Sequence, residues 1–334
     1  MIFITGCSGL VGSFIARRLL AAGHSVRALR RKDSNLHYLT DIKDQIEWVE
    51  GDVLDVSRLY DVMQGAKQVI HSAALVSFTP KTKDLMYKVN IEGTANVVNI
   101  SLELGIEKLV FISSVAALGR RKNAEVIDEK AQWEPSKFNT HYAQTKYLAE
   151  MEVWRGHVEG LNSIVVNPSL ILGPSPWERS STQLFKYVWD EKKFYAAGSL
   201  NYVDVRDVAE IVYQLFIGEY TGERYIVNAG NISFKELFEK IAKTFNKRAP
   251  YIKVTPLIAA LAWRGALLQS FFTRKPPFIS KETAYMSQKH FYYKNDKIID
   301  TLNFQFKPLQ ESINWACAEL AQHNHLRACL KFND

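Results

Sequence analysis

The sequence contains few of the residues that build disulfide frameworks and metal centres. Its 334 residues include three cysteines, and the odd number and wide spacing of Cys7, Cys317 and Cys329 suit neither a set of disulfides nor a zinc site. The eight histidines are scattered, with no HExxH motif or similar ligand spacing. The chain also begins on a strand-like apolar run rather than a signal peptide. We therefore expect a cytoplasmic protein with reduced thiols and no bound metal.

Long apolar segments and runs of one charge are also missing. The composition, 47% hydrophobic and 23% charged, is that of an ordinary globular protein. The net charge is +7, but acidic residues lie among the basic ones, which favours a solvated surface over nucleic-acid binding and also suits an anionic ligand. The most apolar stretch, residues 256–272, contains Arg264 and is shorter than the roughly 20 residues of a membrane-spanning helix. We expect an amphipathic helix over a substrate pocket, with attachment to a membrane surface as the alternative.

The beginning of the chain has the pattern of a dinucleotide-binding loop. Residues 1–4 form a short apolar run typical of a buried strand, and residues 5–12 (TGCSGLVG) follow it directly. Apolar side chains then recur at helical spacing from Val11 to Ala22, and Gly23 ends the expected helix. A dinucleotide-binding loop requires a strand, a glycine-rich turn and a helix in this order, and all three are expected here. The alternative interpretation is a glycine-rich turn that binds no ligand.

Each glycine of this turn has its own expected role. Gly6 would allow the sharp turn, Gly9 would let a pyrophosphate approach the main chain, and Gly12 would let the helix pack closely on the strand. The first turn of the helix would offer unpaired N–H groups and a partial positive charge to the phosphates. The turn therefore predicts where the phosphates of a dinucleotide bind.

Strand and helix patterns alternate through the first half of the chain, which predicts a parallel sheet with ligands at the carboxyl ends of its strands. Proline and glycine break this rhythm from about residue 168. We expect an α/β protein, with a Rossmann-type doubly wound parallel sheet in residues 1–167 and a smaller mixed α/β substrate-binding lobe in 168–334, with some exchange of chain between them. The expected strands cover residues 1–4, 25–29, 45–50, 67–72, 108–113, 161–167, 202–203 and 225–227, and the expected helices cover 56–64, 82–104, 140–158, 205–217 and 233–246.

Charged residues follow the second and third expected strands. Arg30 and Arg31 end the second strand, where a dinucleotide fold places an acid for the ribose of NAD or an arginine for the 2′-phosphate of NADP. Arginine forms charge-assisted bonds to phosphate, and Asp33 lies beyond the strand end, so the pattern favours NADP with NAD as the alternative. Asp52 follows the third strand and could accept a hydrogen bond from the adenine amino group.

A tyrosine and a lysine share one face of the helix expected over 140–158. Tyr142 and Lys146 are four residues apart. A free tyrosine has a pKa near 10, and a neighbouring ammonium lowers that pKa by favouring the phenolate. The pair could therefore exchange a proton with a substrate oxygen. Ser113 and Ser114 end the fifth strand, where a serine hydroxyl could bond the same oxygen.

Taken together, these motifs resemble the extended short-chain dehydrogenase/reductase family, also named the NAD-dependent epimerase/dehydratase family. The resemblance covers most of the chain, and the arginines after the second strand with VNPSLILGP (166–174) are most similar to its dihydroflavonol-4-reductase-like branch. The motifs are TGCSGLVG (5–12), GD (51–52), HSAA (71–74), NIEGT (90–94), SS (113–114), YAQTK (142–146), NPS (167–169), NYVDVRDVAE (201–210) and GERYIVNAG (222–230).

The resemblance implies a role for each matching residue. Tyr142 would be the general acid–base, Lys146 would lower its pKa and hold the nicotinamide ribose, and Ser114 rather than Ser113 would polarise the substrate carbonyl. Asn90 would be either structural or directly involved. Asp204 and Arg206 would position the second lobe. The residues expected to contact the cofactor are Thr5, Gly6, Ser8, Gly9, Leu10, Val11, Gly12, Arg30, Arg31, Asp52, Val53, Ala73, Ala74, Tyr142, Lys146, Pro168 and Ser169.

The leading hypothesis for function is an NADP(H)-dependent oxidoreductase that reduces a ketone or aldehyde. A nucleotide-sugar epimerase or dehydratase with tightly bound NAD(P) is the runner-up, and a non-catalytic NADP-binding sensor is a third reading. Aromatic residues of the second half suit either a hydrophobic substrate or an ordinary core. The long helices 82–104 and 140–158 resemble those that pair in homodimers of the family, and a monomer also stays open.

Overall fold

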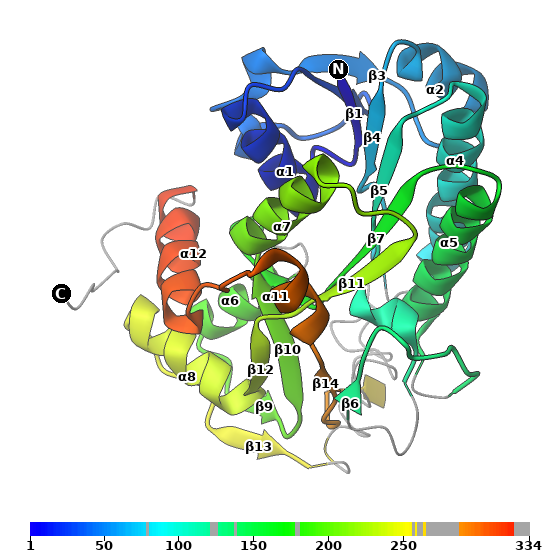
Figure 1. The fold of residues 1–334 in the computed structure, drawn as a ribbon. Helices are drawn as coiled ribbons and strands as arrows, with labels where there is room; N and C mark the ends of the chain where they lie inside the picture. Colours follow the sequence, from blue (N-terminus) through cyan, green and yellow to red (C-terminus); the bar gives the residue numbers. More distant parts are fainter. Residues whose placement is uncertain are drawn as a thin grey trace.

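The computed structural model describes residues 1–77, 80–120, 126–136, 139–177, 181–255, 258, 263–264 and 287–323. A parallel sheet with helices on both sides forms the larger part of the molecule, and a group of helices and short strands lies against one end of it (Figure 1). The expected α/β class, a Rossmann-type sheet with a smaller mixed lobe, is confirmed. The division of the chain at residue 167 stays a prediction.

The main sheet has seven strands, all parallel, and its strand order changes direction between the first and fourth strands. In doubly wound folds, ligands bind in the crevice at such a switch point, beyond the carboxyl ends of the strands. From edge to edge the strands are β11 (Glu223–Val227), β7 (Ser163–Pro168), β5 (Lys108–Ile112), β4 (Gln68–His71), β1 (Ile2–Thr5), β2 (Val26–Arg30) and β3 (Glu47–Glu50).

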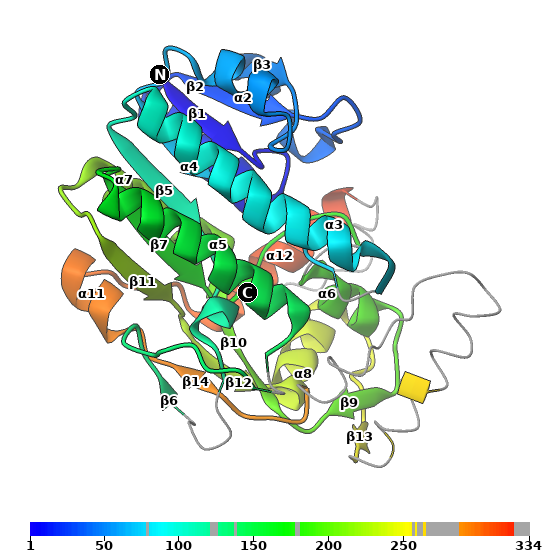
Figure 2. The ribbon, with the colours of Figure 1, turned by 90° about the vertical axis from the view of Figure 1, so that its right-hand side faces the viewer.

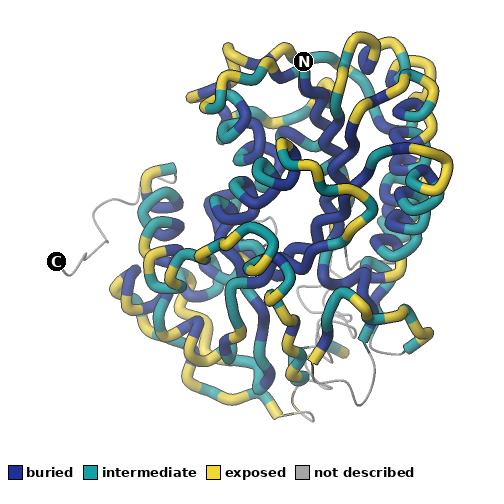
Figure 3. The backbone as a smooth tube through the Cα atoms, in the orientation of Figure 1, coloured by how far each residue is buried: buried dark blue, intermediate teal, exposed yellow. Residues whose placement is uncertain are grey.

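The two faces of this sheet feed two separate hydrophobic cores, because successive side chains of a strand point to opposite faces. Ile2 and Ile4 of β1 enter one core, and Phe3 between them enters the other. The inner strands of the sheet are accordingly buried, whereas the edge strand at residues 47–50, the surrounding loops and the outer helix faces carry exposed residues (Figure 3). The first core is covered by α1 (Leu10–Ala21), α7 (Val205–Ile217) and α11 (Asp296–Leu302), and the second by α2 (Val56–Met63), α4 (Gly93–Glu103) and α5 (His141–Val158).

The helix expected over residues 82–104 is present and includes a π-helical turn. It consists of α3 (Lys83–Tyr87), a π-helical segment (Lys88–Glu92) and α4, which runs beside α5 on the same face of the sheet (Figure 2). Segments of this kind occur often at functional sites. The widened turn includes the buried Asn90, so the expected helical stretch is confirmed and contains one π-helical turn.

One strand of the second half belongs to the main sheet. The sequence pattern assigned residues 225–227 to the smaller lobe, but β11 pairs in parallel with β7, for example at Tyr225 opposite Val166. The helix before it, α7, packs along α1. A short apolar strand has no local feature that names its partner, which explains why its neighbour could not be predicted.

The smaller lobe has a core of its own. Phe185 and Phe245 are fully buried in it, and burial of a side chain of this size stabilises a fold by about 1.5–3 kcal/mol. Most aromatic residues of the second half therefore serve as core, although Phe194 is exposed. The elements of this core are β8 (Leu170–Leu172), α6 (Thr182–Trp189), β10 (Ser199–Asp204), β12 (Gly230–Ser233), α8 (Phe234–Phe245) and α12 (Leu309–His323). Two small parallel pairs complete the lobe: β9 (Phe194–Ala196) with β13 (Ile252–Val254), and β6 (Val126–Ile127) with β14 (Tyr292–Tyr293).

Two sequence-based expectations fall wholly or mostly outside the described ranges. The apolar stretch 256–272 is described only at Ile258, Trp263 and Arg264, so its helix over a pocket stays a prediction. Cys329 is also outside, while Cys7 and Cys317 are buried free thiols. Where the chain is described, no helix is both long and apolar enough to cross a bilayer.

Candidate active site

The glycine-rich turn between β1 and α1 has the shape that a pyrophosphate requires. Gly6 has φ +72°, a conformation that favours glycine, and a Cβ on it would lie 2.5 Å from the Ala73 nitrogen. Gly9 precedes the helix and has no side chain with which to cap the first turn, which contains no acidic residue. The N–H groups of Leu10, Val11 and Gly12 point out of this turn without helical acceptors. This cradle suits the phosphates of a dinucleotide.

Gly12 brings α1 against the turn itself. A Cβ on Gly12 would lie 2.8 Å from the Cys7 Cα and closer still to the Gly6 carbonyl oxygen. The sequence predicted that Gly12 lets the helix pack on the strand. In the structure the helix packs instead on the backbone of residues 6–7, which follow the strand. This contact fixes the distance between the two sides of the cradle.

The predicted 2′-phosphate site lies at the end of β2. Arg30 is the last residue of the strand and Arg31 follows it. The Arg31 guanidinium is 63% exposed and lies 3.8 Å from the Asp33 carboxylate, which is 84% exposed. Such a surface ion pair contributes little. Arg31 can therefore exchange this partner for a phosphate at small cost.

Asp52 and Val53 follow β3. The Asp52 Oδ1 accepts a hydrogen bond from the Leu54 amide at 3.0 Å, so one of its two oxygens orders the loop. Val53 is buried, and its side chain packs against Gly93 at the start of α4. The Val53 side chain therefore has a packing role. The second carboxylate oxygen of Asp52, Oδ2, does not take part in the bond to Leu54 and stays the predicted acceptor for the adenine amino group.

A buried histidine links the first and fourth strands where they end. His71 Nδ1 lies 2.6 Å from the Thr5 hydroxyl, and His71 Nε2 lies 3.0 Å from the Thr94 hydroxyl. Burial, with a smaller effect of Lys146, lowers the pKa of His71 to about 3, so the imidazole is neutral. The Thr5 hydroxyl also accepts from the Ala73 amide at 3.2 Å. Thr5 therefore ties the glycine-rich turn to the segment after β4, where Ala74 is exposed.

The structure brings Ser114 and Tyr142 together. Ser114 follows β5, and its hydroxyl is hydrogen-bonded to Tyr142 near the first turn of α5. The Ser114 hydroxyl also accepts from the Ala116 amide at 3.2 Å, which fixes its rotamer. Burial raises the pKa of Tyr142 to about 12, while the bond to Ser114 acts in the opposite direction. In the protein alone the phenol is thus protonated at neutral pH.

Lys146 lies one helical turn beyond Tyr142 and is buried at 2% exposure. Its ammonium donates to the Ile112 carbonyl oxygen at 2.8 Å and lies 4.4 Å from the centre of the Phe111 ring. Burial lowers the pKa of Lys146 to about 7, against the opposing effect of Glu150. The lysine is thus poised to change its charge near neutral pH.

The Asn90 side chain makes three hydrogen bonds. Its Oδ1 accepts from the Leu75 amide at 2.7 Å, and its Nδ2 donates to the Leu75 carbonyl and to the Thr145 hydroxyl, each at 3.0 Å. Thr145 precedes Lys146, and its hydroxyl donates to the Tyr142 carbonyl at 2.8 Å. The π-helical turn thus places Asn90 as a structural link between the segment after β4 and α5. Of the two roles left open for Asn90, this arrangement favours the structural one.

Pro168 and Ser169 lie at the end of β7, near the ends of β5 and β11. The Ser169 amide donates to the Val227 carbonyl at 3.0 Å. The Ser169 hydroxyl is buried and has no hydrogen-bond partner among the described residues. A buried hydroxyl in this state costs about 1–3 kcal/mol unless a ligand bonds it. The glycine-rich turn and the Ser169 hydroxyl without a partner among the described residues both fit a bound dinucleotide.

Comparison with known proteins decides the family. The model of the NAD dependent epimerase/dehydratase family matches residues 2–230. The chain belongs to this family. A putative dihydroflavonol 4-reductase of Synechocystis sp. is 31% identical over 97% of this chain and 96% of its own length. Cinnamoyl-CoA reductase 1 of Oryza sativa subsp. japonica is 27% identical over 98% and 92%.

Solved structures agree with this assignment. The crystal structure of gox2253 is 30% identical, covers 98% of this chain and 99% of its own, and has a TM-score of 0.83. A UDP-glucose 4-epimerase of Thermotoga maritima, solved with UDP-glucose, has a TM-score of 0.78 over 96% of this chain and 98% of its own at 18% identity, which shows the fold alone. The resemblance to the extended short-chain dehydrogenase/reductases and their dihydroflavonol-4-reductase-like branch is confirmed. The protein is an NAD(P)-dependent oxidoreductase or epimerase of this type.

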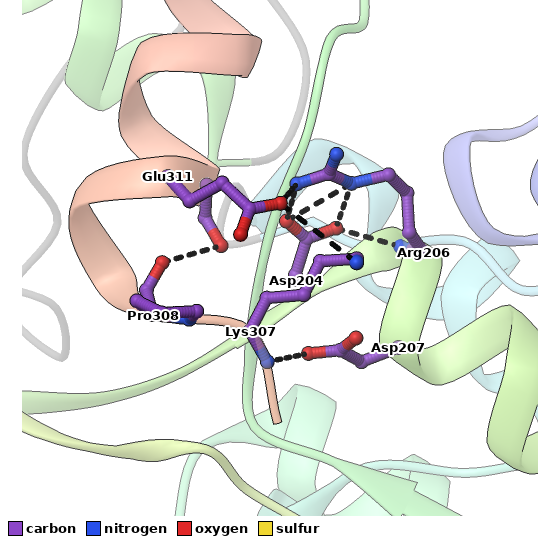
Figure 4. Close-up of polar contacts among 7 residues, drawn as sticks. Asp204, Arg206, Asp207, Lys307, Pro308 and Glu311 are labelled. Atoms are coloured by element: carbon purple, nitrogen blue, oxygen red, sulfur yellow. Dashed lines mark hydrogen bonds and ion pairs between the residues drawn. The ribbon is translucent and has the colours of Figure 1, made fainter. Parts of the chain in front are cut away.

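In this member of the epimerase/dehydratase family, the motif around Asp204 joins α7, which covers the main sheet, to α12 of the smaller lobe (Figure 4). Asp204 accepts from the Arg206 amide at 2.8 Å at the start of α7 and pairs with the Arg206 guanidinium at 2.7 Å. The same guanidinium lies 3.3 Å from Glu311 of α12. The Asp207 carboxylate accepts from the Lys307 amide at 2.9 Å. These contacts agree with a positioning role for the motif.

One charged group beside the site was not expected from the sequence. Glu150 lies four residues after Lys146 and is completely buried. The available signal was its spacing, because residues 142, 146 and 150 share one face of α5. A glutamate at such a position is usually solvated, and only the packing of α5 on the sheet shows that this one is not.

Proposed function

We propose that the protein is an NADPH-dependent reductase of a ketone or aldehyde. The observation that carries the proposal is the Ser114 hydroxyl bonded to Tyr142, with the buried Lys146 one turn further along α5. The names of its relatives, a putative dihydroflavonol 4-reductase and cinnamoyl-CoA reductases, support a reductase over an epimerase. NADPH, when bound in the cradle, supplies the hydride that reduces the carbonyl carbon.

The residues of the chain orient the carbonyl and supply the proton. The Ser114 hydroxyl donates a hydrogen bond to the substrate oxygen and so stabilises the negative charge that develops there. Tyr142, which burial keeps protonated, donates its proton to the same oxygen. The Lys146 ammonium then stabilises the phenolate that remains. Each group acts from an element whose end lies at the carboxyl edge of the sheet.

A panel of substrates tests the reaction class. We expect bulky aromatic ketones or aldehydes to be reduced with loss of NADPH absorbance, and nucleotide sugars to give neither NADPH oxidation nor an epimerised product. The purified protein is assayed with each class under the same conditions, with chromatography of the sugar nucleotides as a second readout. Conversion of a nucleotide sugar without net cofactor oxidation would establish the epimerase alternative instead.

The cofactor preference depends on the arginines after β2. We expect tighter binding of NADPH than of NADH, and we expect Arg31→Ala to weaken NADPH binding by about 10- to 150-fold, because a charge-assisted bond is worth about 1.5–3 kcal/mol. NADH binding should not change. Dissociation constants are measured by titration calorimetry with both cofactors.

The neighbouring Lys32 provides the matched control for this measurement. It is also exposed and cationic, but it lies one residue further from the strand. Lys32→Ala should therefore change NADPH affinity much less than Arg31→Ala or Arg30→Ala. Equal affinities of the unmodified protein for NADPH and NADH would refute the assignment.

A further inference from the structure

Glu150 connects the two halves of the proposed catalytic site. We propose that its buried carboxylate is a positioning residue that keeps Lys146 in its ammonium form and fixes the main chain of Ser114. This inference rests on the proposed function, because it assigns a role within the same site. Glu150 acts through these two residues and not on the substrate.

The contacts of Glu150 lead directly to the strand end that carries Ser114. Its Oε1 accepts hydrogen bonds from the Ser113 hydroxyl and from the Asn167 Nδ2, each at 2.5 Å. The same Asn167 Nδ2 donates to the Ser114 carbonyl oxygen at 2.9 Å. A buried donor that loses its acceptor costs about 1–3 kcal/mol. The carboxylate thus orders both residues at the end of β5, and with them the hydroxyl that meets Tyr142.

The charges around Glu150 also lead to Lys146. Lys146 precedes Glu150 by one turn of α5. Both residues are buried, with 2% of Lys146 and 0% of Glu150 exposed to solvent. Across the sheet, the Arg224 Nη1 of β11 lies 3.6 Å from the Glu150 Oε2. Two further titratable residues among the described ones face Lys146: Tyr142 on its own helix and the neutral His71 on β4. The Glu150 carboxylate therefore lies 3.6 Å from one cation, Arg224, and on the same helix face as a second, Lys146.

Burial shifts the pKa values of Glu150 and Lys146 toward the uncharged form of each group, and the interaction between the two groups opposes both shifts. Burial raises the pKa of Glu150, while Arg224, the two hydrogen bonds and Lys146 favour its charged form. Burial lowers the pKa of Lys146 to about 7, and Glu150 opposes that change. Removal of the carboxylate should therefore let the Lys146 pKa fall further. At neutral pH a smaller share of Lys146 would then carry the charge that supports Tyr142.

The test replaces Glu150 with its uncharged isostere. In Glu150→Gln we expect the Lys146 pKa to fall by about one pH unit, the lower end of the effect of a nearby opposite charge. It is measured in the protein without cofactor, by nuclear magnetic resonance of lysines labelled at the ε carbon, with the Lys146 signal assigned by its loss in Lys146→Met. In the loaded enzyme, the alkaline limb of the pH–rate profile for reduction should move to lower pH by a similar amount. The alkaline limb moves to lower pH because reduction needs Tyr142 and Lys146 in their protonated forms. The negative charge of Glu150 raises the pKa of both groups, so its removal lets them lose their protons at lower pH.

Glu152 is the matched control. It lies on the same helix, is partly exposed and pairs with Arg155 at 3.0 Å. Glu152→Gln removes the same charge from α5 without touching the buried cluster and should leave both pH curves unchanged. If Glu150→Gln gives the same curves as Glu152→Gln, the proposal is wrong, whatever happens to the turnover number.

Glu150→Asp covers the case in which the glutamine variant does not fold. It keeps the charge and shortens the side chain, so the Lys146 pKa should stay within about half a unit of its original value. A fall of a full unit in this variant would contradict the proposal, because the charge is still present. This test is independent of the proposed function, because the Lys146 titration is measured without turnover. The proposed reaction is tested separately, by the rate of a variant that lacks the Tyr142 hydroxyl.

Discussion

Tyr142→Phe should lower kcat by about 10²–10⁴-fold, the range over which a positioned general acid contributes. The phenol is the proton donor in the proposed reaction, and a phenylalanine ring fills the same space without a proton to give. The residue is only partly buried, so the fold should tolerate the change. Affinity for NAD(P)H should remain nearly intact, because the cradle that holds the phosphates lies on α1. The measurement combines steady-state rates on the best carbonyl substrate with a cofactor titration.

Tyr147→Phe separates the loss of this proton from the loss of any tyrosine hydroxyl. Tyr147 also lies on α5, and its ring stacks on Trp133 at a centroid distance of 4.5 Å. Removal of its hydroxyl leaves that stacking in place, so kcat should change little. If both variants keep the original rate, Tyr142 is not the proton donor, and the proposed mechanism fails while the family assignment stands.

The elements that could be predicted from the sequence are those with strong local patterns. The helix expected over 140–158 is α5, His141–Val158, and the helix expected over 205–217 is α7, with the same bounds. In both, a side chain at the N-cap accepts from the first turn: Thr140 for α5 and Asp204 for α7. Such caps, with apolar residues at helical spacing, are read directly from the residue order.

The features that could not be predicted depend on contacts between distant segments. The π-helical turn at Asn90 exists because that side chain meets Leu75 and Thr145, which lie 15 and 55 residues away. The burial of Glu150 depends on Ser113, Asn167 and Arg224, which come from three different strands or strand ends. No window of the sequence contains these partners. The same holds for β11, which pairs with β7, a strand far earlier in the chain.

The juxtaposition of Ser114 and Tyr142 lies between these two cases. Each residue belongs to a recognisable motif, and the parallel sheet places the end of β5 near the start of α5 by its topology. The hydrogen bond between them could be anticipated only through the resemblance to the family. Local spacing alone predicts the pair Tyr142 and Lys146, since both lie on one helix.

Gly12→Ala should weaken NAD(P)H binding by about 5- to 150-fold, since overpacking of this kind costs about 1–3 kcal/mol. The added Cβ would meet the backbone of Gly6 and Cys7, and a backbone cannot rotate away as a flexible side chain can. Relief requires α1 to move away from the turn, which widens the cradle in which the phosphates lie. Binding is followed by calorimetry, and the free energy of unfolding by denaturant titration.

Gly23→Ala gives the comparison that separates cofactor binding from stability. Gly23 lies just beyond the other end of α1 at φ +82°, and no atom lies within 4 Å of a Cβ placed on it. An alanine there pays only the strain of a left-handed conformation, about 1–2 kcal/mol, with no clash. Both variants should therefore lose stability, but only Gly12→Ala should lose affinity for the cofactor. Equal affinities in the two variants would mean that the contact between Gly12 and the turn does not shape the phosphate site, and that the N–H groups of α1 bind the phosphates without it.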